Sequence, residues 1–155
     1  MKQLLNIDVN GEAHEIAVEP YATLLDVLRE QLGITGPKRG CDTGGCGCCT
    51  VLINGRSHYA CMAYASTVQD KAITTVEGLV NGAELHPLQQ AFVDHGAVQC
   101  GYCSSGFIMA AKELLDKNRN PTRAEIRQAI AGNLCRCTGY TKIVDAIEAA
   151  ATAVS

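Results

Sequence analysis

The sequence predicts an α+β protein, with a small sheet and one helix in residues 1–77 and only helices in residues 78–155. Apolar residues alternate with polar ones in the first part, which is typical of strands, and recur at helical spacing in the second. Hydrophobic residues make up 47% of the 155 residues, enough for a packed core. The nine cysteines form two groups, one in each part.

The chain is expected to begin with a hairpin. In LLNIDVNG, Leu5, Ile7 and Val9 alternate with polar residues and predict a half-buried strand. The Asn10-Gly11 pair is a strong turn signal, and HEIAV predicts the returning strand.

A helix and a second hairpin are expected next. TLLDVLREQLG has helical spacing, with Thr23 able to cap its start and Gly33 able to end it. The glycine-rich stretch GPKRGCDTGGCGCC predicts a loop. TVLING and RSHYACMA predict a hairpin around Asn54-Gly55, and AITTV predicts a last short strand. Together these elements indicate a small sheet packed on one helix.

The second part is expected to contain four helices. HPLQQAFVDHG predicts a short helix that ends at Gly96, and SSGFIMAAKELLDKN predicts a longer one with an apolar stripe. In PTRAEI, Thr122 and Glu125 match a capping box, and KIVDAIEAAATAV predicts the final helix. Four short helices of this kind can form a compact bundle.

Composition and charge exclude several classes of protein. The formal net charge of −3 gives no basis for binding nucleic acid. No apolar run approaches the length of a membrane span, and MKQLLNIDVNGEAH lacks the apolar segment of a secretory signal. We therefore expect a cytoplasmic protein with neither nucleic acid nor a membrane as a partner. In a reducing compartment, an odd number of clustered cysteines favours metal binding over disulfides.

The first cysteine group has the spacing of a known iron–sulfur ligand pattern. Cys41, Cys46 and Cys49 follow C-x4-C-x2-C, with Cys61 further on, as in plant-type [2Fe–2S] sites. The glycines between them permit positive φ and leave N–H groups free to donate to cluster sulfurs. A structural zinc site is the alternative, although zinc usually uses CxxC pairs on short turns.

Cys48 is a surplus cysteine in the first group. Four thiolates complete one [2Fe–2S] cluster, and the spacing selects Cys49 rather than Cys48. We interpret Cys48 as a small buried apolar side chain.

The second cysteine group provides four more thiolates. Cys100 and Cys103 form a C-x2-C pair, and Cys135 and Cys137 are separated by one residue. Cys103 and Cys137 each precede a predicted helix, whose N-terminal N–H groups favour an anionic cluster with a charge of about −2. Zinc is an alternative for this group by itself, but a less favoured one beside the first group.

With both groups in view, the chain resembles the small iron–sulfur subunits of the molybdenum hydroxylases, the xanthine dehydrogenase family. The resemblance covers essentially the whole chain and is carried by GCDTGGCGCCTVLING, VQCGYCSSGFIMAA and AGNLCRCTGYTKI. It implies a β-grasp ferredoxin-like domain over residues 1–77 and a four-helix bundle over residues 78–155. It also implies two [2Fe–2S] clusters, one bound by each of the two cysteine groups.

The resemblance further implies cofactors and partners on other chains. These are a large subunit with molybdopterin, expected as the cytosine dinucleotide, and a medium subunit with FAD, in a heterotrimer or a dimer of heterotrimers. The second cluster is expected near the molybdopterin, with Gln99 bonded to the pterin and Cys137 beside its amino group. The first cluster is expected to face the flavin. The chain would then relay electrons for a molybdenum-dependent dehydrogenase or hydroxylase.

Two other classes of protein are alternatives to this function. A freely diffusing ferredoxin needs only one cluster, so the helical part would be superfluous. A zinc-binding or redox-sensing module would be colourless if it held zinc. The substrate of the complex stays open among carbon monoxide, aldehydes, N-heterocycles, purines and aromatic CoA thioesters, because the substrate pocket is expected on another chain.

Overall fold

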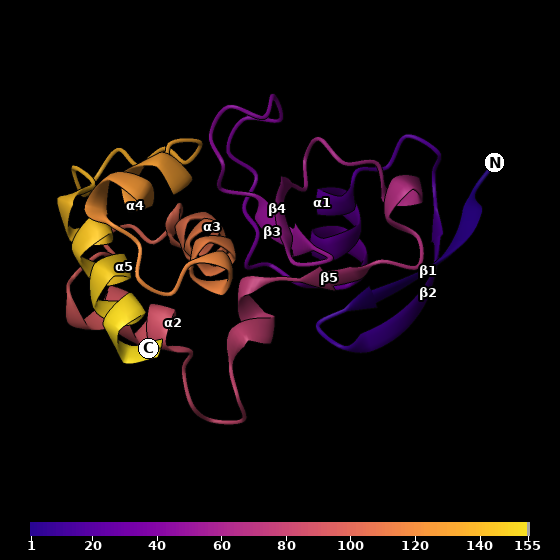
Figure 1. The fold of residues 1–155 in the computed structure, drawn as a ribbon. Helices are drawn as coiled ribbons and strands as arrows, with labels where there is room; N and C mark the ends of the chain where they lie inside the picture. Colours follow the sequence, from indigo (N-terminus) through magenta and orange to yellow (C-terminus); the bar gives the residue numbers. More distant parts are fainter. Residues whose placement is uncertain (155) are drawn as a thin grey trace.

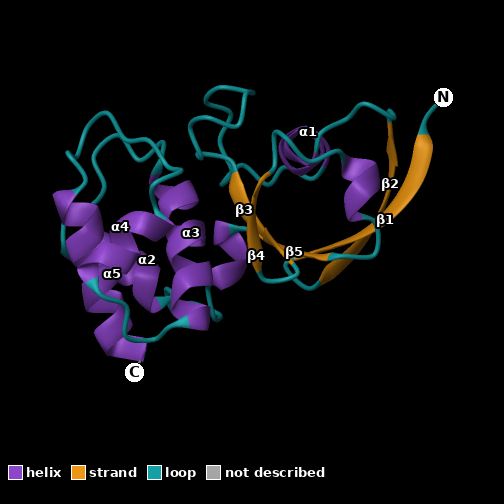
Figure 2. Cartoon of the chain, turned by 45° about the horizontal axis from the view of Figure 1, so that its top comes forward, coloured by secondary structure: helices purple, strands orange, loops and turns teal. Residues whose placement is uncertain are grey.

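The structure, a computed structural model that describes residues 1–154, has a sheet-containing half and a helical half placed side by side (Figures 1 and 2). The N-terminus lies at the far end of the sheet half, and the C-terminal helix lies in the helical half. The α+β fold class is confirmed. In the described part of the chain, no helix is long and apolar enough to cross a membrane.

The strands of residues 1–154 form one mixed five-stranded sheet with the order β2-β1-β5-β3-β4. β1 pairs with β2 and β3 with β4 in antiparallel hairpins, while β5 lies parallel to β1 and antiparallel to β3. The central place of β5 therefore joins the two hairpins into one sheet. The strand bounds are Gln3–Val9 (β1), Glu12–Val18 (β2), Thr50–Ile53 (β3), Arg56–Tyr59 (β4) and Ala72–Thr74 (β5).

The two predicted Asn-Gly turns are confirmed. Asn10 and Asn54 have φ values of 57° and 49°, and the glycine after each is also in the left-handed region. Two successive positive φ values define the tight turn whose twist matches a hairpin. The local sequence thus sets the register of both hairpins.

The helix predicted after Thr23 exists but changes its pitch. α1 spans Leu24–Asp26, begins with a capping box between Thr23 and Asp26, and continues as a π-helical segment over Val27–Gln31. The wider turn is marked by the Leu32 N–H, which donates to the Val27 carbonyl at 3.1 Å. The segment buries its leucines and valine against the sheet and forms the core of this half.

The four predicted helices of the second part are present. α2 starts at a capping box formed by His86 and Gln89, and α4 starts at the predicted Thr122–Glu125 capping box. Their apolar faces, with Phe92 and Phe107 fully buried, form a second core. The helix bounds are Pro87–Asp94 (α2), Ser104–Lys117 (α3), Arg123–Ala129 (α4) and Thr141–Val154 (α5).

The predicted division at residue 77 falls inside a short 3-10 helix, Val76–Leu79. Val76 and Leu79 pack against the helical core, although they directly follow β5. The boundary itself stays a prediction.

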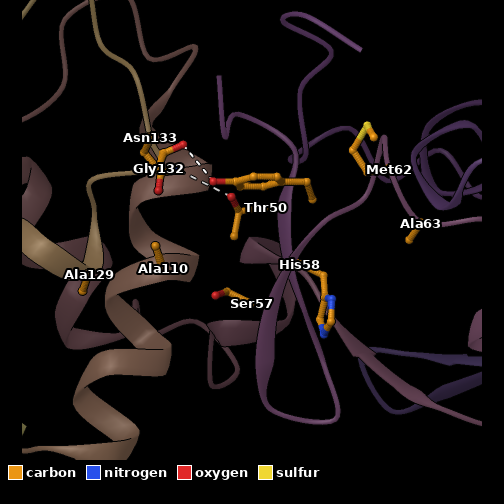
Figure 3. A pocket seen from close by; sticks show the side chains of 10 residues that line it. Thr50, Ser57, His58, Met62, Ala63, Ala110, Ala129, Gly132 and Asn133 are labelled. Carbon is orange, nitrogen blue, oxygen red and sulfur yellow. Dashed lines mark hydrogen bonds between the residues drawn. The ribbon is translucent and has the colours of Figure 1, made fainter. Parts of the chain in front are cut away.

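The two halves meet where α3 packs against β3 and β4. The buried Asn133 side chain donates to the Gly47 carbonyl at 2.9 Å and also lies 3.4 Å from the Thr50 hydroxyl. Figure 3 shows Asn133 and Gly132 facing Thr50 across this junction, beside a cavity of about 510 Å³. No cysteine lines this cavity, so it is separate from the thiol groups.

Gly106→Ala tests how closely the halves approach. A Cβ at position 106 would overlap the Gly47 carbonyl oxygen and come within 3.1 Å of the Cys48 Cα. Because both neighbours are backbone atoms, we expect a loss of about 1–3 kcal/mol in the free energy of unfolding, measured by urea denaturation. Gly45→Ala is the matched control, since its Cβ would meet only the Thr43 hydroxyl at 3.7 Å. Equal stability of the two variants would contradict the close approach.

Candidate metal centres

The first cysteine group lies at one end of the β3–β4 hairpin and in the loop that precedes it. Cys41 and Cys46 lie in the loop, Cys49 directly precedes β3, and Cys61 follows β4. The Ala60 N–H donates to the Cys49 carbonyl at 3.2 Å, which extends the hairpin pairing past the strand ends. Thus the hairpin brings Cys49 and Cys61 together across 12 residues of sequence.

The thiols of this group approach one another in pairs. Hydrogen bonds from Thr43 and from Cys46 lower the pKa of the Cys41 thiol to about 6. Burial and the neighbouring Cys61 thiol raise the pKa of Cys49 to about 12. The structure therefore places Cys41 beside Cys46, and Cys49 beside Cys61.

Gly40 leaves space for two cysteine sulfurs in the loop, because it has no side chain. A Cβ at Gly40 would lie 2.8 Å from the sulfurs of both Cys46 and Cys48. The Thr43 N–H also points at the Cys41 sulfur, 3.4 Å away. The loop is thus shaped around sulfur atoms and directs a backbone donor at one of them.

The second cysteine group surrounds a small cavity in the helical half. Cys100 and Cys103 precede α3, while Cys135 and Cys137 lie in the loop between α4 and α5. All four line a cavity of about 180 Å³. Burial and the Cys135 thiol raise the pKa of Cys103 to about 12, and a hydrogen bond to Cys100 raises the pKa of Cys137. These thiols also approach in pairs, Cys103 with Cys135 and Cys100 with Cys137.

Cys135 has the most donors of the second group. Thr138 approaches its sulfur with the backbone N–H at 3.4 Å and the hydroxyl at 3.1 Å. Burial opposes ionisation of this thiol, but the bonds from Thr138 outweigh it, and the pKa of Cys135 is lowered. The Cys135 N–H donates to the Tyr140 hydroxyl at 3.0 Å, which fixes the turn.

One backbone hydrogen bond connects the two groups. The Leu134 N–H donates to the Cys46 carbonyl at 2.9 Å, and Leu134 directly precedes Cys135. Residues of the two groups that lie 89 positions apart in the sequence (46 and 135) are therefore neighbours in space.

The thiols of each group suit a two-iron unit. Each group offers two pairs of thiols, and thiolates are the ligands of [2Fe–2S] clusters. Four thiols in each half therefore fit such a cluster, and in the first half Gly40 leaves room beside two of the sulfurs.

Gln99 and Cys48, which the sequence analysis also singled out, lie in different surroundings. Gln99 is exposed beside Cys100, so its predicted bond to a pterin stays a prediction. Cys48 is buried, as expected for a small apolar side chain, but its sulfur lies 3.3 Å from that of Cys46. Cys48 also lines the cavity of the second group, which its sequence spacing did not indicate.

Comparisons with known proteins assign a class to each half. A family described as "2Fe-2S iron-sulfur cluster binding domain" matches residues 7–75, and one described as "[2Fe-2S] binding domain" matches residues 75–148. The nicotinate dehydrogenase small FeS subunit of Eubacterium barkeri is 49% identical, over 94% of this chain and 93% of the relative. The aldehyde oxidoreductase iron-sulfur-binding subunit of Escherichia coli (strain K12) is 43% identical, over 95% of this chain and 71% of the relative.

Solved structures agree with these relatives. The structure of quinoline 2-oxidoreductase from Pseudomonas putida 86 matches with a TM-score of 0.95 and 44% identity, over 98% of this chain and 95% of the matched chain. The aldehyde oxidoreductase from Desulfovibrio desulfuricans ATCC 27774 also matches with a TM-score of 0.95 and 44% identity. That match covers 98% of this chain but only 17% of the other, so there the same fold is part of a longer chain.

The fold and the two thiol groups thus define a protein with two [2Fe–2S]-binding domains. More narrowly, the chain belongs to the family of small iron–sulfur subunits of the molybdenum hydroxylases, whose members transfer electrons within molybdenum-dependent oxidoreductases. The sequence-based prediction of the family is confirmed.

Thr138→Val tests the donors to Cys135. Valine has a similar shape but no hydroxyl, so the Cys135 thiolate loses one hydrogen bond and its pKa rises. In iron-free protein at pH 7 we expect Cys135 to be alkylated roughly fivefold more slowly, because the thiolate is the reactive form. Alkylation of this residue can be followed by mass spectrometry. Thr138→Ser keeps the hydroxyl and should react as the native chain does, and an unchanged rate in the valine variant would contradict the interpretation.

Proposed function

We propose that this chain relays electrons from a molybdopterin cofactor on one partner subunit to a flavin on another, through two [2Fe–2S] clusters. The single observation that carries the proposal is the hydrogen bond from the Leu134 N–H to the Cys46 carbonyl. It holds the loop of the second thiol group against the loop of the first, and this proximity supports electron transfer between clusters bound there. A freely diffusing ferredoxin has no need of a second group held against the first.

The ligands of the N-terminal cluster in this proposal are Cys41, Cys46, Cys49 and Cys61. The C-x4-C-x2-C spacing supports this set, as do the two thiol pairs and the space left at Gly40.

The ligands of the second cluster are Cys100, Cys103, Cys135 and Cys137. The cavity that all four line supports this set. Cys103 is the residue that precedes the first turn of α3, where free N–H groups favour an anionic cluster. When bound, the two clusters supply one-electron redox chemistry, and this chain's own residues hold them and set their potentials.

The partners are a large molybdopterin-binding subunit and a medium FAD-binding subunit, in a heterotrimer or a dimer of heterotrimers. Exposed apolar side chains near the second group support a covering partner, because such patches mark interaction sites. Leu134 is 56% exposed, and Val98 and Tyr102 are also exposed. Gln99 and Cys137, both exposed beside this patch, are the residues we place nearest the pterin, which we expect as the cytosine dinucleotide.

The substrate is selected on the partner that holds molybdenum, not on this chain. Similar small subunits occur in proteins named for nicotinate, nicotine, aldehyde and xanthine chemistry. Small subunits of this kind therefore accompany enzymes with different substrates. We propose the cytoplasm as its location, because an odd number of clustered cysteines argues against a disulfide framework and is typical of a reducing compartment.

Metal analysis of the native complex tests the cluster content. We expect about four iron atoms and four acid-labile sulfides per copy of this chain, because two four-thiolate groups hold two irons each. Cys49→Ala should remove one of the two paramagnetic signals of the reduced protein. Zinc in place of iron, or a fully loaded sample with two irons, would overturn the proposal.

Cys137→Ala tests the order of the relay. Loss of this ligand is expected to remove the signal of the second cluster and to slow reduction of the flavin by substrate at least a hundredfold. The N-terminal cluster should stay intact, because its proposed ligands lie in the other half. The measurements are electron paramagnetic resonance and stopped-flow reduction of the assembled complex. Lys2→Ala, in the N-terminal strand region away from both groups, is the control. Flavin reduction at the native rate would remove Cys137 from the path.

A further inference from the structure

Cys48 belongs to neither proposed ligand set, yet it contacts one cysteine group and lines the cavity of the other. Its side chain is buried, with 6% of its surface exposed. On one side its thiol donates to the Cys46 sulfur at 3.3 Å. On the other, Cys48 lines the 180 Å³ cavity of the second group. Cys48 is therefore a residue shared by the surroundings of both cysteine groups.

Two separate segments, residues 38–40 and α3, hold Cys48 in this place. The Lys38 N–H donates to the Cys48 carbonyl at 3.0 Å and fixes the backbone. Gly40 leaves room for the thiol, since a Cβ there would lie 2.8 Å from its sulfur. Gly106 of α3 lets the helix approach the Cys48 Cα. A small apolar residue would also fit here, so the steric constraints alone do not explain the sulfur.

We propose that Cys48 is a positioning residue that donates an S–H hydrogen bond to the Cys46 sulfur and thereby raises the reduction potential of the N-terminal cluster. The inference rests on the proposed role of Cys46 as a ligand. The thiol of Cys48 is the donor in the 3.3 Å contact, and a cysteine S–H group is a weak hydrogen-bond donor.

The physical reason is the charge that reduction adds. If Cys41, Cys46, Cys49 and Cys61 hold a cluster, it would supply one-electron redox chemistry, and its reduced state would place more negative charge on these ligand sulfurs. A hydrogen bond to such a sulfur would be stronger in the reduced state and would favour reduction. Because the acceptor is the Cys46 sulfur, this stabilisation would act on the N-terminal cluster.

The test compares Cys48→Ala with Cys48→Ser in the intact complex. Redox titrations followed by electron paramagnetic resonance give the midpoint potential of each cluster. In Cys48→Ala we expect both signals to remain and the one-electron reduction constant of the N-terminal cluster to fall about threefold, or roughly 28 mV at 59 mV per tenfold. Cys48→Ser keeps a donor and should retain a potential closer to that of the native chain than to that of the alanine variant.

Val68→Ala is the matched control. Val68 is buried in the core of the sheet-containing half, so the variant loses packing but no hydrogen bond to the Cys46 sulfur, and its potentials should not move. If Cys48→Ala has the same potential as the native complex, the proposed role of the hydrogen bond is wrong. It is also wrong if Cys48→Ala and Cys48→Ser have the same potential. Loss of the N-terminal signal in Cys48→Ala would instead show that Cys48 is a ligand, which overturns this inference and the proposed ligand set together. Retention of both signals with an unchanged potential overturns the inference alone.

Discussion

The rest of the structure depends on the close approach of backbone at Gly47 and Gly106. A Cβ on Gly106 would overlap the Gly47 carbonyl, so α3 reaches the cysteine loop only because position 106 lacks a side chain. A Cβ on Gly47 would in turn overlap the Gly132 carbonyl and the Asn133 side chain. The Gly47 carbonyl accepts the hydrogen bond from the buried Asn133. One peptide group thus binds both a helix and a distant loop. Because Cys46 and Cys48 flank this peptide, the contact also sets the distance between the two thiol groups.

Near the first thiol group, hydrogen bonds stabilise negative charge on sulfur more than ion pairs do. Arg39 lies near the first group, but it pairs with Asp26 and with Asp42 at 2.5 Å, so its charge is already balanced. The donors that reach sulfur include the backbone of Thr43, the Thr138 side chain and backbone, and the Cys48 thiol. Fixed dipoles of this kind stabilise an anionic cluster without adding a mobile counter-charge. A change of one electron can then be accommodated with little rearrangement.

The sequence was sufficient for features that depend on neighbouring residues. Both Asn-Gly turns, the helix cap at Thr23, the capping box at Thr122 and the strand alternation are local, and the structure confirms them. The cysteine spacing indicated the two thiol groups, although their ligand roles stay a prediction. The π-helical segment after Asp26 was not predicted, because its pitch depends on packing against the sheet.

Features that join distant segments could not be read from the sequence. The fit of Gly106 against Gly47 and the bond from Asn133 connect positions tens of residues apart, and no local pattern marks them. Cys48 shows the same limit most clearly. Its spacing excluded it from the ligand set, and its apolar character predicted burial, both without reference to α3. Only the fold brings the start of α3 and the 132–137 loop to its other side, and this turns a surplus cysteine into the link between the two thiol groups.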